Sequence, residues 1–150
     1  MTHHGVFDMA AFGAVPGLTI AAPMDELELR NMMYTGLQYG HPFMIRYPRG
    51  NGAGRLWRGV PFEALPVGRG RRLREGTDVA LVTVGTVGNA AARAAERAAA
   101  KGVSVAHYDL RFAKPLDEAL LAGVGAEFRH VVTVEDGSLR GGVGEAVTAF

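Results

Sequence analysis

The sequence predicts an α/β fold with a mainly parallel sheet that is covered by helices on both faces. Short apolar or β-branched segments alternate along the chain with segments whose apolar residues recur at helical spacing, a pattern typical of such folds. The 150 residues include 21 glycines and 7 prolines, many of which separate these segments. With 48% hydrophobic and 21% charged residues, the composition indicates a folded globular protein.

The first third of the chain predicts a strand–helix–strand unit. Residues 17–22 form an apolar run that is typical of a buried strand. After a proline, the acidic residues Asp25 and Glu26 occupy the first turn of a predicted helix that continues through Tyr39. Glycine and proline then end the helix, and residues 43–47 form the next predicted strand.

Residues 52–75 are predicted to be a linker, because they are rich in glycine and contain Pro61 and Pro66. The linker ends in a basic run, Arg-Gly-Arg-Arg-Leu-Arg, at residues 69–74. This run fits either an anion-binding or nucleic-acid-binding patch or a solvated linker. The solvated linker is favoured because most charge runs face water.

The second half predicts a regular succession of strands and helices. Strands are expected at 78–84, 103–108 and 130–134, and helices at 89–101, at 116–121 and from residue 145. The first half alone supplies too few elements to close a core, and the last helix has barely begun at Phe150. We therefore expect two incomplete domains, and hence a partial chain.

Charge and cysteine content exclude several classes of function. Basic and acidic side chains number 16 and 15, which argues against a dedicated nucleic-acid or membrane-surface binder. The absence of cysteine excludes disulfides, thiolate catalysis and Cys-based metal sites. No segment approaches the roughly 20 apolar residues of a membrane span, and the first residues lack the pattern of a signal peptide. We expect a cytoplasmic protein.

Two residues are candidates for binding an anionic substrate. Arg49 lies in the segment Arg-Tyr-Pro-Arg-Gly-Asn at 46–51, which follows a predicted parallel strand at the edge where α/β sheets bind ligands. Its guanidinium can hold a phosphate through two parallel hydrogen bonds, although a solvated loop arginine fits the spacing equally well. His3 is a candidate general acid/base or anion donor. Taken alone, it is more simply a surface loop histidine.

Two glycine motifs and an acidic pair receive structural interpretations. Gly85 and Gly88 lack the full dinucleotide-binding pattern and indicate close packing of a helix on a strand. Residues 141–144, Gly-Gly-Val-Gly, are interpreted in the same way, with an anion-binding nest as the alternative. Glu135 and Asp136 have no His or Cys neighbour, so they are expected to be structural or interface acids rather than a metal site.

Motifs spread over essentially the whole chain carry a family resemblance. They are Thr-His-His-Gly-Val-Phe-Asp at 2–8, Ile-Ala-Ala-Pro-Met-Asp-Glu at 20–26, Arg-Tyr-Pro-Arg-Gly-Asn at 46–51, Pro-Val-Gly-Arg-Gly at 66–70, Asp-Leu-Arg-Phe-Ala-Lys-Pro-Leu-Asp at 109–117, Val-Thr-Val-Glu-Asp at 132–136 and Gly-Gly-Val-Gly at 141–144. In this order they resemble the 1-deoxy-D-xylulose-5-phosphate synthases, which are thiamin-diphosphate enzymes related to transketolase.

This resemblance implies both a fold and a reaction. Residues 1–51 would be the C-terminal part of a three-layer α/β/α pyrimidine-binding domain. Residues 76–150 would be the N-terminal part of a transketolase-type C-terminal α/β/α domain. The family consists of homodimeric transferases that condense pyruvate with D-glyceraldehyde 3-phosphate and release CO2. Their product is a precursor of isoprenoids in the methylerythritol phosphate pathway, and of thiamin and pyridoxal.

The resemblance also implies roles for the two candidate residues. His3 matches a substrate-site histidine, which makes it the expected catalytic residue and a contact for substrate oxygens or phosphate. Arg49 matches the arginine that binds the phosphate of the acceptor. The residues that hold thiamin diphosphate and Mg2+ lie largely outside this chain in the family. We therefore expect no cofactor or metal site here, and no activity from the isolated chain.

Two alternative functions remain open. The first is a β-type subunit of a 2-oxo-acid dehydrogenase, which shares both domains; the motifs at 46–51 and 109–117 favour the synthase. The second is a non-catalytic module that binds a phosphorylated metabolite or pairs with a complete synthase subunit.

Overall fold

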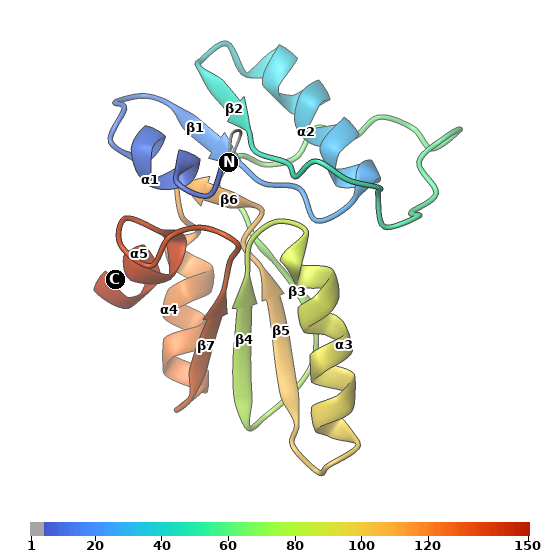
Figure 1. The fold of residues 1–150 in the computed structure, drawn as a ribbon, viewed down its shortest axis with the longest axis vertical. Coiled ribbons are helices and arrows are strands. Elements are labelled where there is room, and N and C mark those ends of the chain that lie inside the picture. The colour runs from blue at the N-terminus through green and yellow to red at the C-terminus, as the bar shows by residue number, and fades with distance from the viewer. Residues whose placement is uncertain (1–4) are drawn as a thin grey trace.

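The computed structural model describes residues 5–150, which form a small sheet and a large sheet (Figure 1). The small sheet has the strand order β2–β1–β6, and the large sheet has the order β3–β5–β4–β7. The strands are β1 (Thr19–Ala21), β2 (Phe43–Ile45), β3 (Arg71–Arg74), β4 (Val79–Thr83), β5 (Val105–Asp109), β6 (Phe112–Lys114) and β7 (Val131–Val134). The helices are α1 (Asp8–Gly13), α2 (Glu26–Tyr39), α3 (Val87–Ala99), α4 (Glu118–Glu127) and α5 (Val143–Ala149).

The predicted α/β fold is confirmed, and three of the five strand pairs formed by residues 5–150 are parallel. β1 pairs in parallel with β2, and β4 pairs in parallel with β5 and β7. The parallel strands of the large sheet point their carboxyl ends toward the small sheet (Figure 1). Since ligands of open α/β sheets bind beyond these ends, the junction of the two sheets is the natural place to look for a site.

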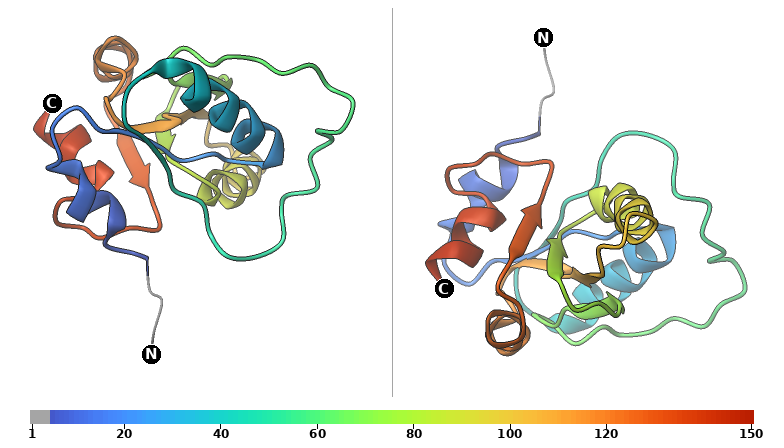
Figure 2. Two further views of the ribbon diagram at one scale, coloured as in Figure 1. Left: turned by 90° about the horizontal axis from the view of Figure 1, so that it is seen from above. Right: turned by 90° about the horizontal axis from the view of Figure 1, so that it is seen from below.

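Side-chain alternation along the large sheet provides an apolar surface for helices on each of its faces. Ala80 and Val82 of β4 belong to the same core cluster as Leu121 of α4. Leu81, between them, instead packs with Ala91 of α3. Figure 2 shows α3 and α4 on opposite sides of this sheet.

The prediction of a solvated linker over residues 52–75 is wrong for residues 71–74, which form β3. This strand pairs antiparallel with β5 at the edge of the large sheet. The arginines of the basic run find partners inside the protein. Arg71 forms ion pairs with Glu28 and Asp109, and Arg72 stacks over the ring of Tyr108. Arg71 and Arg72 therefore have acidic and aromatic partners that are distant in sequence, although Arg69 and Arg72 stay exposed.

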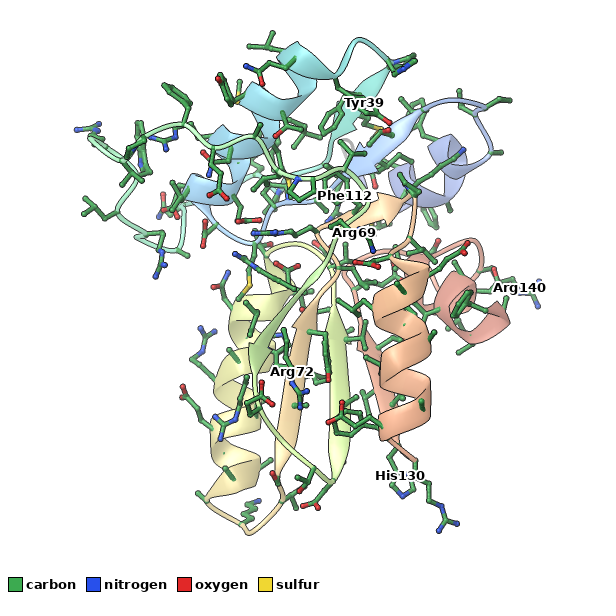
Figure 3. The ribbon with its side chains drawn as sticks, turned by 180° about the vertical axis from the view of Figure 1, so that it is seen from behind. Tyr39, Arg69, Arg72, Phe112, His130 and Arg140 are labelled. Atoms are coloured by element: carbon green, nitrogen blue, oxygen red, sulfur yellow. The ribbon has the colours of Figure 1, made fainter. Side chains whose placement is uncertain are left out.

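β6 links the two sheets, although it was not predicted as a strand. It follows β5 of the large sheet but pairs antiparallel with β1 of the small sheet. Its first residue, Phe112, is completely buried and packs with Ala21, Met32 and Leu65 (Figure 3). The second half of the chain therefore supplies one edge of the sheet that the first half begins.

We expect Phe112→Ala to lower the free energy of unfolding by about 3–5 kcal/mol, because it leaves a cavity where the two sheets meet. Urea unfolding followed by circular dichroism measures this loss. Leu139→Ala is the matched control, since the Leu139 side chain is 88% exposed, and its effect should stay within about 0.5 kcal/mol. Equal effects of the two substitutions would contradict this placement of β6.

Candidate functional site

The loop after β2 places Arg49 beside an open cavity of about 580 Å³ between α2 and α3. We call it the α2–α3 cleft. It is lined by residues 23–26 and 29, by residues 47–53, and by Thr86, Asn89 and Arg93. β1 and β2 are parallel, so the cleft lies beyond their shared carboxyl ends, as predicted for Arg49. Its volume suits a small-molecule ligand.

Glu26 at the start of α2 holds the loop that carries Arg49. Its carboxylate accepts hydrogen bonds from the backbone N–H groups of Gly54 (2.8 Å) and Arg55 (3.3 Å). Backbone N–H groups, first its own and then that of Gly54, hold the pKa of Glu26 below its usual range. Gly52 lies against the same side chain, and a Cβ at this position would collide with the Glu26 carboxylate. A larger residue at position 52 would therefore force the Glu26 side chain to shift.

The segment 54–65, which we call the connector, is held along the rest of α2. The Arg30 guanidinium donates to three backbone carbonyls, those of Trp57 (2.6 Å), Val60 (2.8 Å) and Pro61 (2.7 Å). The Thr35 hydroxyl, one turn further along α2, accepts a hydrogen bond from the N–H of Leu65 (2.8 Å). One helix thus fixes both the connector and the loop that precedes it.

The other wall of the cleft is the beginning of α3. The Asn89 side chain donates to the carbonyl of Met24, at 2.7 Å, and so ties α3 to the segment before α2. Gly88 allows this approach, because a Cβ there would lie 3.0 Å from the Thr83 hydroxyl and 3.1 Å from the Met24 sulfur. The structural interpretation of the first glycine motif is confirmed. Arg93 lies one turn beyond Asn89 and also lines the cleft.

A buried charge network fixes α2 to the large sheet beside the cleft. Glu28 accepts hydrogen bonds from Arg111 (Nε, 2.9 Å; Nη2, 3.0 Å) and from Arg71 (Nη1, 3.0 Å). Arg71 also pairs with the fully buried Asp109, at 3.0 Å. Burial raises the pKa of Asp109, while the Arg71 charge opposes that rise. Burial, together with the charge of Arg71, lowers the pKa of the nearby His107.

The two arginines of the motif at 46–51 have different environments. Arg46 is partly buried, with ion pairs to Asp8 at 3.5 Å and to Asp136. Two carboxylates of the chain itself therefore neutralise the charge of Arg46. Arg49 is exposed on the cleft and has no ion pair with any of residues 5–150. Of the two, Arg49 is the one available to a ligand.

The second glycine motif binds an anion that belongs to the chain itself. The Glu135 carboxylate accepts hydrogen bonds from the N–H groups of Val143 (3.1 Å) and Gly144 (2.9 Å) at the start of α5. The structural interpretation of Glu135 and Asp136 is confirmed, since Asp136 pairs with Arg46. The alternative, an anion-binding nest, agrees with these contacts, and the anion is the chain's own Glu135 carboxylate.

Within residues 5–150, no group of three His, Asp or Glu side chains has an arrangement that holds a metal ion. No helix in the same part is long and apolar enough to cross a membrane. His3, the other predicted site residue, lies outside the described residues.

Comparison with known protein families identifies both halves of the chain. Residues 1–54 match the family described as transketolase, pyrimidine binding domain, and residues 68–150 match transketolase, C-terminal domain. The chain belongs to the transketolase family. Its resemblance to this family, stated above from the motifs, is confirmed, and so is the expected combination of domain types.

Two curated relatives of this transketolase-family chain carry the same name. The chain is 58% identical to a 1-deoxy-D-xylulose-5-phosphate synthase of Bacteroides fragilis, over 99% of this chain and 23% of the relative. A protein of the same name from Anaeromyxobacter dehalogenans is 49% identical over 97% of this chain and 23% of its own length. The chain therefore spans about a quarter of the length of these relatives.

Solved structures agree with the family assignment. A protein described as "Split gene transketolase, inactive beta4 tetramer" superposes with a TM-score of 0.88 at 30% identity, covering 98% of this chain and 48% of that one. A transketolase mutant of Pichia stipitis has the same fold, with a TM-score of 0.70 at 18% identity, over 93% of this chain and 21% of its own.

We expect Gly52→Ala to free the loop that carries Arg49, because the added methyl group displaces the Glu26 carboxylate from the Gly54 and Arg55 amides. Hydrogen exchange measures the effect, and the protection of these two amides should fall toward that of an exposed loop. Gly123→Ala in α4 is the control, since a Cβ there meets no atom within 4 Å. Unchanged protection in Gly52→Ala would refute this role for Glu26.

Proposed function

We propose that this transketolase-family chain is part of a 1-deoxy-D-xylulose-5-phosphate synthase. The complete enzyme would condense pyruvate with D-glyceraldehyde 3-phosphate and release CO2, in the methylerythritol phosphate route to isoprenoids and to thiamin and pyridoxal. The observation that carries the proposal is the placement of Arg49, which lines a ligand-sized cleft beyond the ends of two parallel strands and has no ion pair within residues 5–150. The common name of the curated relatives supports the reaction.

In this proposal Arg49 binds the phosphate of the acceptor. A guanidinium presents two parallel N–H donors, which match two oxygens of a phosphate. Pro48 and Gly50 flank Arg49, and the loop is held against Glu26, so little freedom is lost when the ligand binds. Pyruvate carries no phosphate, so this contact selects and orients the acceptor aldehyde alone. His3 is proposed to contact substrate oxygens or phosphate in the same site.

The cofactors of the complete enzyme are proposed to be thiamin diphosphate and Mg2+. The described residues do not fit this pair. They offer no metal-binding cluster, and the acids of the cleft, Asp25 and Glu26, already accept hydrogen bonds from backbone N–H groups. We therefore assign both cofactors to other parts of a homodimeric enzyme that acts in the cytoplasm.

We expect Arg49→Gln, made in the full-length synthase, to raise the KM for D-glyceraldehyde 3-phosphate by roughly tenfold or more, because a charge-assisted hydrogen-bond pair is lost. The KM for pyruvate should stay within about twofold in the same steady-state assay. Arg140→Gln is the control, since Arg140 lies beside α5, away from the cleft (Figure 3). An equal rise in both KM values would count against phosphate binding by Arg49.

We also expect the isolated 150-residue chain to form no product, because its described residues, 5–150, offer no metal-binding cluster and we assign both cofactors to other parts of the enzyme. The test supplies thiamin diphosphate, Mg2+ and both substrates to the purified chain and measures 1-deoxy-D-xylulose 5-phosphate by mass spectrometry. The full-length synthase under the same conditions is the positive control, and measurable product from the chain alone would refute the expectation.

A further inference from the structure

We propose that Asn51 is a site of spontaneous covalent modification, at which the backbone nitrogen of Gly52 attacks the asparagine side chain and a carboxylate replaces its amide. The motif at 46–51 was interpreted through its arginines, and Asn51 had no role there. The modification site follows from the loop alone. Its consequence for substrate binding rests on the proposed function of Arg49.

The first argument is the residue that follows Asn51. Asn51 and Gly52 form the one Asn-Gly pair in the sequence. Glycine has no side chain to shield its nitrogen, and its backbone adopts conformations that other residues avoid. Both residues are exposed and lie outside helices and strands, in the loop between β2 and β3. The side chain of Asn51 can therefore reach the nitrogen that attacks it.

The second argument is that the reacting groups are not engaged elsewhere. Within residues 5–150, the Asn51 amide makes no hydrogen bond and the Gly52 N–H donates to no acceptor. The Gly54 and Arg55 amides, in contrast, donate to the Glu26 carboxylate. The contacts that hold the loop thus begin after the reacting pair and leave it free to change conformation.

The other two asparagines of the chain are held in helices. Asn31 of α2 is 4% exposed and accepts the N–H of Glu63 at 3.4 Å. Asn89 of α3 donates to the carbonyl of Met24 at 2.7 Å. Helical side chains point toward the N-terminus of their helix, so their amide carbon stays away from the nitrogen of the next residue. The chain therefore contains two internal references that should not react.

The reaction needs water and no other reagent. The Gly52 nitrogen forms a bond to Cγ of Asn51, the Cγ–Nδ2 bond breaks, and ammonia leaves with the proton of the Gly52 N–H. Water then opens the cyclic imide by breaking one of its C–N bonds. Opening at Cγ gives aspartate, and opening at the backbone carbonyl gives isoaspartate, whose chain continues through the side chain. Nothing is oxidised or reduced, and either product carries a carboxylate in place of a neutral amide.

The new carboxylate lies on the same cleft as Arg49, two positions along the loop. A carboxylate in contact with water is ionised at neutral pH. It attracts the Arg49 guanidinium and repels a phosphate, and both effects oppose binding of the phosphorylated acceptor. Isoaspartate also adds a carbon atom to the backbone between Arg49 and the Gly54 amide that Glu26 holds. Modification of Asn51 therefore lowers the affinity of the cleft for the acceptor phosphate.

The first test follows the three asparagines by mass spectrometry while the full-length synthase is incubated in warm buffer. Trypsin cleaves after Arg and Lys, so the asparagines fall into separate peptides, 31–46, 50–55 and 75–93. Peptide 50–55 should gain an oxygen atom in place of an NH group, faster at mildly alkaline than at neutral pH, because the attacking nitrogen must lose its proton. The other two peptides of the same digest should keep their masses.

Two controls make this test specific to the folded loop. Asn51→Gln should keep the mass of peptide 50–55, since the longer side chain needs a larger ring. An end-capped synthetic peptide of residues 50–55 gives the rate of the unrestrained sequence, and the folded synthase should convert Asn51 within about tenfold of that rate. No conversion in the folded enzyme, or a rate as low as that of the other two asparagines, overturns the inference.

The second test measures the consequence for binding. The KM for D-glyceraldehyde 3-phosphate should rise with the converted fraction in the incubated wild type, and should keep its own starting value in Asn51→Gln incubated in parallel. Freshly made Asn51→Asp should show a KM at least about threefold above that of the wild type. The KM for pyruvate should stay within about twofold. Thermal melting checks that each variant is folded.

The two tests separate this inference from the proposed function. If Asn51 converts but Arg49→Gln leaves the KM for the phosphorylated acceptor unchanged, the role of Arg49 is wrong and the modification site stands. If Arg49→Gln raises that KM but neither incubation nor Asn51→Asp does, the role of Arg49 stands and the effect of the modification on binding is overturned. If Asn51 does not convert, the inference fails whatever Arg49→Gln shows.

Discussion

The buried carboxylate of Glu28 is the constraint on which the arrangement of the two sheets depends. A carboxylate that is 5% exposed is stable only with good partners, and Glu28 has two guanidinium groups, from Arg71 and Arg111. Both partners lie within residues 68–150, which match the C-terminal domain, whereas Glu28 lies on α2 within residues 1–54, which match the pyrimidine binding domain. The network therefore fixes the two halves to each other and, with them, the two walls of the cleft. The ion pairs of Glu28 fix the relative position of the two sheets. Burial of apolar side chains around Phe112 supplies much of the free energy that holds the sheets together.

α2 transmits this constraint to the loop that carries Arg49. Its inner side holds Glu28 against the large sheet, and Glu26, Arg30 and Thr35 bind the backbone of the loop and connector. These four polar side chains of the helix thus have structural partners. Arg49 lines the cleft without an ion pair within residues 5–150, whereas Arg46, Arg71 and Arg111 near the junction have acidic partners.

Local signals in the sequence predicted much of the fold. α2 was predicted because Asp25 and Glu26 suit a first helical turn and glycine and proline end the helix, and in the structure Asp25 is the N-cap. Arg49 was predicted because Arg-Tyr-Pro-Arg-Gly-Asn follows an apolar strand. β3 and β6 were missed because their pairing partners are distant in sequence and their own residues are basic or few. α1 was missed because its six residues are too short for a periodic pattern. Arg93 resembles any exposed helical arginine, and only the fold brings its helix beside the loop of Arg49.

The pairing of β6 with β1 has a consequence for the order in which the protein is made. During translation, residues 19–45 leave the ribosome well before residues 112–114, so the nascent small sheet lacks its third strand for the time needed to add about seventy residues. At about 5–20 residues per second, this delay lasts several seconds. An unpaired strand edge attracts other chains. A chaperone that shields β1 during this interval would therefore protect the edge whose partner strand, β6, has not yet been made.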